Sequence, residues 1–145
     1  MAIKSFKDLD VFQNAYQSAL SVMLDIIPHL PVSEKYSLVD QLRRSSKAIP
    51  ALIAEGFAKK HLPKAFQKYL VDAMGECNEV VVHLSYCRDL YQKNLSRDLC
   101  SQLITQYDII GKQLYRLNIA WQSFRAQARI SETKDQTHFQ QPSTK

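Results

Sequence analysis

Glycine is scarce in this chain, and the scarcity limits the folds it can adopt. Only three glycines and five prolines occur among its 145 residues. β-hairpin turns and phosphate-binding loops both depend on glycine, because glycine adopts left-handed backbone angles without steric cost. An all-β architecture or a Gly-rich nucleotide-binding fold would need more of it. The composition therefore predicts an all-α fold.

Apolar side chains recur every three or four residues in four segments, which is the spacing that gathers them on one face of an α-helix. The first segment covers residues 9–27 and stops at Pro28. The second covers residues 33–57, with Ser33 as its predicted N-cap and Pro50 as a predicted bend. These two segments predict the first half of a helical domain.

The other two segments complete the predicted architecture. Pro63 suits the first position of a third helix, which is expected to end near Tyr91. Ser96 is the predicted cap of a fourth helix, whose apolar positions continue over residues 99–124. Four helices joined by short connections form an antiparallel up-down four-helix bundle. We expect this bundle to occupy residues 1–130.

The C-terminal residues 131–145 differ from the rest of the chain. Phe139 is their only large apolar side chain, and the other positions are mostly polar or charged. Such a segment buries too little apolar surface to offset the entropy cost of ordering. We expect a disordered tail.

Charge and targeting signals narrow the function classes. Lysine and arginine outnumber acidic residues by 19 to 14, which gives a net charge of +5 and favours an anionic partner. The N-terminus lacks the apolar stretch of a signal peptide, and no apolar run approaches the roughly 18 residues of a membrane span. The three cysteines show no CxxC spacing, so neither a disulfide framework nor a zinc ribbon is expected. A cytoplasmic location without membrane contact is predicted.

The sequence offers no constellation that predicts catalysis. Glu79 and His83 form one Glu-x-x-x-His pair, whereas di-metal bundles need Glu-x-x-His on each of two helices. A pair on the surface of one helix is the better interpretation. The cysteines lie among apolar residues and are expected in the core. The histidines have no Ser-His-Asp context. We therefore expect neither an enzyme nor a bound metal or cofactor.

Basic residues fall in three groups that suit phosphate contacts better than base reading. We take them as the candidate nucleic-acid-binding residues: Arg43, Arg44 and Lys47; Lys59, Lys60, Lys64 and Lys68; Lys112 and Arg116. The ten residues 59–68 carry four lysines and no acidic residue. The alternative interpretation is that these charges only keep a solvated surface soluble.

A second apolar stripe lies on the fourth predicted helix, away from its core-facing side. At 100° per residue, it comprises Ile104, Tyr115, Ile119 and Ile130. A monomeric bundle has little use for such a stripe, so it predicts a subunit interface in a homo-oligomer. Scattered surface apolar residues are the alternative.

One segment carries a specific family resemblance. Residues 41–56 read Q-L-R-R-S-S-K-A-I-P-A-L-I-A-E-G. They resemble the signature Q-[IL]-R-R-[AS]-[AS]-x-S-I-P-x-N-I-A-E-G of the bacterial four-helix-bundle family first described from intervening sequences of 23S rRNA genes. Residues 6–15 and 66–79 also look like this family. Ala48 and Leu52 depart from it, because they replace the usual Ser and Asn.

The resemblance implies further expectations. The family includes the accessory variability determinant of diversity-generating retroelements, a basic pentameric barrel that binds nucleic acid and a reverse transcriptase. Residues 110–114 look like part of that subgroup's last helix, although Leu117 stands where its tryptophan is expected. A homopentameric ring is thus implied, with RNA or DNA as a partner and a reverse transcriptase as a further candidate.

The matched positions also have structural explanations. Gly56 could cap a helix in the left-handed conformation, and Gly75 could allow a neighbour to approach closely. Glu55 and Glu79 are expected to pair with Arg43 or Arg44. Two functions therefore compete: a non-enzymatic, homo-oligomeric nucleic-acid-binding accessory protein, and a structural or protein-interaction scaffold without a nucleic-acid ligand.

Overall fold

The structure is a computed structural model of the chain, and it describes residues 2–138. These residues form helices and turns, with no β-strand among them. Four long helices make up most of the molecule: α1 Asp10–Ser21, α2 Leu38–Ala58, α3 Pro63–Leu90 and α4 Arg97–His138. The all-helical class and the four helices expected from the apolar spacing are confirmed. No helix in the described part of the chain is long and apolar enough to cross a membrane.

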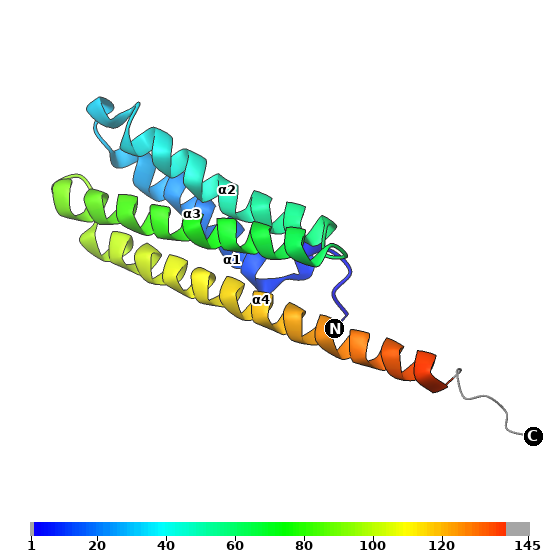
Figure 1. Cartoon of the computed structure of the whole chain (residues 1–145). Coiled ribbons are helices and arrows are strands. Elements are labelled where there is room, and N and C mark those ends of the chain that lie inside the picture. Colours follow the sequence, from blue (N-terminus) through cyan, green and yellow to red (C-terminus); the bar gives the residue numbers. More distant parts are fainter. Residues whose placement is uncertain (1, 139–145) are drawn as a thin grey trace, which may run out of the picture.

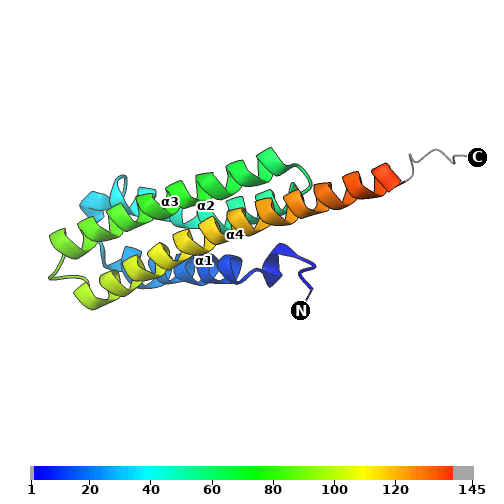
Figure 2. The same cartoon turned by 60° about the horizontal axis from the view of Figure 1, so that its bottom comes forward.

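The helices pack into a bundle around one core, and both views show them side by side (Figures 1 and 2). α3 contacts α2 and α4, while α1 contacts the same two helices from the other side. The three cysteines are buried in this core, as expected. The largest fully buried side chains follow the predicted apolar spacing and include Leu42, Ile49, Ile53, Leu70, Leu84, Tyr107, Ile110 and Leu114.

Short helical turns flank α1. The 3-10 helix η1 Phe6–Asp8 precedes it, and a capping box formed by Ser5 and Asp8 starts that turn. After Ser21 the backbone widens into the π-helical turn η2 Val22–Ile26 and then tightens into η3 Ile27–His29. Pro28 lies in this last turn, so the first helical segment ends where the sequence predicts.

The start of α2 differs from the prediction. Ser33 does not cap it, because residues 32–34 form a separate 3-10 turn, η4 Val32–Glu34. Ser37 occupies the N-cap position without a side-chain cap bond. Instead, Glu34 Oε2 accepts the backbone N–H of Leu38 at 3.0 Å. A carboxylate one turn upstream thus replaces the predicted serine.

The boundaries of α3 and the start of α4 agree with the sequence. Pro63 is the first residue of α3, and Leu90 is its last. The Ser96 hydroxyl accepts the backbone N–H of Leu99 at 3.2 Å, as expected of an N-cap. Pro50 lies buried inside α2, which continues to Ala58.

Two glycines have roles other than those predicted. Gly56 lies within α2, and no glycine in the described residues has a positive φ, so it is not a left-handed cap. A Cβ on Gly56 would lie 2.8 Å from the Cβ of Tyr69, which shows that α2 and α3 approach closely there. Gly75 was expected to allow such an approach, yet nothing lies within 4 Å of its Cβ position.

Helix α4 continues past the predicted boundary at residue 130. Residues 131–138 are helical and project beyond the bundle, which corrects the expectation of disorder for them (Figures 1 and 2). In this extension the Ser131 and Thr133 hydroxyls donate to the carbonyl oxygens of Gln127 and Arg129, one turn earlier. Composition predicts whether a segment buries apolar surface, and residues 131–136 are all exposed. The rest of the predicted tail, including Phe139, lies outside the described residues.

Candidate nucleic-acid interface

The cations predicted on α2 divide into two environments. Arg44 Nη1 lies 3.1 Å from Glu76 Oε1, and its Nη2 bonds to Glu79 Oε1. The hydrogen bond from Arg44 lowers the pKa of Glu79, while bonds to Glu79 and Glu76 raise the pKa of Arg44. The predicted pairing of Glu79 with Arg44 is confirmed. Two carboxylates therefore neutralise Arg44, which makes it a weak candidate for contacting phosphate.

Arg43 and Lys47 have a different setting. They are exposed, and they lie one helical turn apart on α2. Within residues 2–138, no acidic side chain forms an ion pair with either of them. Their charges are available to an external anion.

Lys59 stands at the end of α2 and is held by its neighbours. Its Nζ donates to Tyr69 Oη at 2.7 Å and lies 3.9 Å from Glu55 Oε1. The Tyr69 hydroxyl in turn donates to Glu55 at 3.1 Å. Glu55 thus pairs with Lys59 instead of Arg43 or Arg44, and the network fixes the turn between α2 and α3.

The remaining lysines of this group lie around the same turn. Lys60 Nζ lies 3.8 Å from the centre of the Phe57 ring, and Lys68 Nζ lies 3.3 Å from Asp72 Oδ2. Lys64 is exposed in the first turn of α3, and no described residue forms an ion pair with it. The two lysines at this turn without an acidic partner are therefore Lys60 and Lys64.

Arg125 is a further cation of this region that the sequence did not predict. Its Nη2 donates to the carbonyl oxygen of His61 at 3.5 Å, a contact that links α4 to the turn between α2 and α3. Figures 1 and 2 show that the N-terminal segment, this turn and the projecting part of α4 all lie at one end of the bundle. Extending the core-facing spacing of α4 by one turn beyond Trp121 would have placed Arg125 there. We call Lys59, Lys60, Lys64 and Arg125 the basic end.

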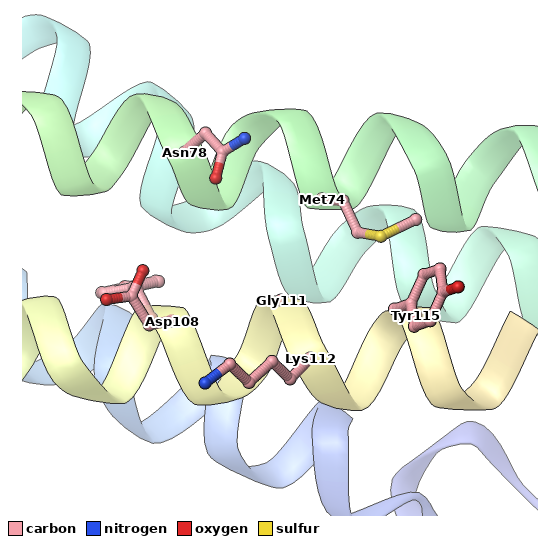
Figure 3. Close-up of a pocket in the computed structure, with 7 residues that line it drawn as sticks. Met74, Asn78, Asp108, Gly111, Lys112 and Tyr115 are labelled. Atoms are coloured by element: carbon pink, nitrogen blue, oxygen red, sulfur yellow. The ribbon is translucent and has the colours of Figure 1, made fainter.

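Lys112 and Arg116 form the third predicted group. Both are exposed on α4, one turn apart, and have no ion pair within the described chain. Lys112 lines a groove between α3 and α4 together with Asp108 and Tyr115 (Figure 3). The three predicted groups therefore occupy separate surfaces of one chain.

The predicted interface stripe is exposed over most of its length. Tyr115, Ile119 and Ile130 are 58%, 47% and 57% exposed. Ile104 is half-buried and packs against the bundle core. The stripe accessible to another molecule thus begins at Tyr115 and runs into the projecting part of α4.

The His83 side chain is partly buried, and the three cysteine side chains are buried. His83 Nε2 lies 3.4 Å from Glu79 Oε1, and no cluster of three metal-ligating side chains occurs in the described part. Burial raises the pKa of the Cys77 and Cys87 thiols to about 12. A thiol in that state is a poor nucleophile at neutral pH.

The fold and these surfaces define a helical-bundle protein with exposed basic groups. A family model of the 23S rRNA-intervening sequence protein matches residues 7–116, which is more than half of the chain. The chain belongs to this family, and the resemblance seen in its sequence is confirmed. Among curated proteins, none matches the chain.

Proposed function

We propose that this protein is a non-enzymatic nucleic-acid-binding protein whose main contacts are to phosphate. The observation that carries the proposal is the basic end. There Lys60 and Lys64 form no ion pair with any of residues 2–138, and Arg125 adds a third charge from α4. The net charge of +5 favours an anionic partner. Membership of a family named for an intervening sequence of 23S rRNA agrees with a nucleic-acid-related role.

Binding of this kind has a defined physical signature. Lysine and arginine contacts to phosphate release condensed counterions, so the affinity falls as salt concentration rises. Such contacts position the protein on the nucleic acid but do not read its sequence. We therefore expect weak sequence preference and strong salt dependence.

We also propose that the chain assembles into a homo-oligomer, with the pentameric ring as the expected form. The exposed part of the stripe beyond the groove, Ile119 and Ile130, would be buried between up-down bundles, while Tyr115 at its start stays accessible. A head-to-tail contact that closes on rotation gives a ring, and a ring would repeat the basic end in each subunit. A light-scattering mass equal to one chain at micromolar concentration would reject the ring.

A protein-interaction scaffold is the second candidate function. The observation that favours it is the set of exposed apolar side chains on α3, namely Val71, Val82, Tyr86 and Leu90. A surface of this kind is typical of protein contacts. A reverse transcriptase as partner and a cytoplasmic location both stay predictions.

The salt dependence of binding separates the two candidates. We expect the double variant Lys60→Ala/Lys64→Ala to reduce the slope of log affinity against log salt by about 1.4 on single strands and about 1.8 on duplex DNA. The matched control is Lys35→Ala/Lys93→Ala, which removes the same charge at the other end of the bundle and should retain the slope. An equal loss in both variants would show that only net charge matters. No binding of RNA or DNA at low salt would favour the scaffold.

A further inference from the structure

A groove of about 450 Å³ runs between α3 and α4 on the outer side of the bundle. Figure 3 shows the side chains that line it: Met74 and Asn78 from α3, and Asp108, Lys112 and Tyr115 from α4. Gly111 lies between the α4 residues. The volume is within the range of roughly 300–1,000 Å³ that is typical of small-ligand clefts. We call this feature the α3–α4 groove.

Gly111 keeps the groove open. It lies in the interior of α4, where glycine is less favourable than alanine. No atom lies within 4 Å of its Cβ position, so packing within the described chain does not require a glycine. A larger side chain at this position would extend into the groove.

The groove has an apolar end and a polar end. Met74 and Tyr115 lie on one side of Gly111 along the groove, and Asn78 and Asp108 lie on the other (Figure 3). Tyr115 is 58% exposed, which leaves an aromatic ring accessible. Neither Asn78 nor Asp108 forms a side-chain hydrogen bond with another described residue. One ligand could therefore contact an aromatic ring and two hydrogen-bonding groups together.

A buried hydroxyl adds a second observation. Tyr107 also lines the groove, its side chain is fully buried, and its hydroxyl has no hydrogen-bond partner in the described chain. Burial raises the pKa of this hydroxyl, so it keeps its proton and can donate. Unsatisfied buried polar groups are rare in folded proteins. Met74, a side chain with three rotatable bonds, also lines the groove.

We propose that the α3–α4 groove binds one unpaired nucleobase of a bound single strand. This inference rests on the proposed function. The ring would contact Tyr115 and Met74, and its polar edge would face Asn78 and Asp108. Asparagine and aspartate are side chains that pair with base edges, and aromatic rings stack on bases of any sequence. Lys112 at the groove and Arg116 one turn further would contact the adjoining phosphates.

The polar lining favours a base over a second copy of the chain. A helix packed into this groove would bury the Asp108 carboxylate and the Lys112 ammonium against an apolar surface, which is costly without partners. A nucleotide brings polar ring edges and an anionic phosphate, which suit both groups. Binding of a second copy in this groove is therefore the alternative that the experiment below must detect.

The experiment compares two single strands that carry the same phosphates. One is a short oligonucleotide with adenine bases, and the other is a strand of equal length made of abasic sites. For the wild-type protein we expect the adenine strand to bind about tenfold more tightly, in line with the stacking contribution per base. The variant Gly111→Leu, which fills the groove, should bind both strands equally. The matched control Gly75→Leu adds the same side chain where a Cβ also meets open space and outside the groove lining, and should keep the preference.

Other outcomes would overturn the inference in distinguishable ways. Equal, salt-sensitive binding of both strands by the wild type would reject the base site and leave the proposed function standing. Failure to bind either strand would reject the proposed function, and the base site with it. Light scattering distinguishes a base from a second copy as the occupant of the groove. If Gly111→Leu lowers the oligomeric mass but leaves the base preference unchanged, the groove binds a second copy.

Discussion

The Tyr91 hydroxyl donates a 2.6 Å hydrogen bond to Glu34 Oε1, between residues that are 57 positions apart in the chain. The other oxygen of Glu34 caps the first turn of α2 through the backbone N–H of Leu38. One carboxylate therefore joins the residue after α3 to the start of α2. Both bonds favour the ionised carboxylate, which is why they lower the pKa of Glu34.

The variant Tyr91→Phe tests this link. We expect a lower midpoint of thermal unfolding at neutral pH, because the variant loses the bond to the Glu34 carboxylate. A lowered pKa contributes stability above the ordinary value of 4.5, and this stability is lost as pH falls through the lowered pKa. The difference between variant and wild type should therefore shrink in acid. A difference that stays constant from neutral pH into acid would contradict the assigned link.

The neutralised state of Arg44 gives a second prediction. The variant Arg44→Gln leaves Glu76 and Glu79 facing each other without their cation, so thermal stability should fall at neutral pH. Mild acid should restore part of it, since the pKa of Glu79 is no longer lowered by Arg44. The salt slope of nucleic-acid binding should not change. A slope reduced as much as in Lys60→Ala/Lys64→Ala would show that Arg44 contacts phosphate.

Gly56 gives a prediction about packing. A methyl group at this position would meet the Cβ of Tyr69 at 2.8 Å. Both carbon atoms are bonded directly to a helix backbone, so they can separate only if α2 and α3 shift relative to each other. We expect Gly56→Ala to lower the free energy of unfolding by about 1–3 kcal/mol, as measured by urea denaturation. Gly75→Ala, where the methyl meets open space, should instead raise it by about 1 kcal/mol. Equal effects at the two sites would rule out the close approach.

Features of the fold could be predicted where the residues that determine them are neighbours in the sequence. Pro63 and Ser96 mark helix starts through their own backbone chemistry, and both predictions are confirmed. Ser33 had an equally good local signal for capping the second helix, but that prediction is wrong. The actual cap of α2 is Glu34, and the hydroxyl that bonds to this carboxylate comes from Tyr91, far along the chain.

The cysteines give a prediction about chemical reactivity. Burial raises the pKa of Cys77 and Cys87 to about 12, so thiolate is scarce in the folded state even at about pH 8. We expect a thiol reagent to label the native protein very slowly and all three cysteines promptly in denaturant. Rapid labelling of a native thiol, located by mass spectrometry, would contradict the buried positions.

The candidate site shows the same division between local and distant information. Lys64 lacks an acidic partner nearby in sequence and also in space, so its prediction as an available cation needed little more than the sequence. Arg44 was predicted as an available cation as well, yet its partners Glu76 and Glu79 lie on another helix. Arg125 was overlooked because the predicted apolar spacing of its helix stopped one residue earlier.

Tyr107 yields a prediction that separates stability from binding. Its buried hydroxyl has no partner in the described residues, so Tyr107→Phe removes a polar group that costs free energy in the folded state. The free energy of unfolding should rise by about 1 kcal/mol. If the groove binds a base as proposed, the same variant should weaken the preference for the adenine strand. A loss of stability would show that the hydroxyl has a partner in solution.

The projecting end of α4 changes how this molecule moves in solution. The whole of helix α4 has 42 residues and extends over about 63 Å at 1.5 Å per residue. A compact domain with as many residues as this chain has a diameter of roughly 40 Å. A particle with such an arm diffuses more slowly than a sphere of equal mass. Gel filtration calibrated with globular standards would therefore assign too large a mass and too many subunits. Absolute scattering mass is the measurement that counts subunits correctly for this shape.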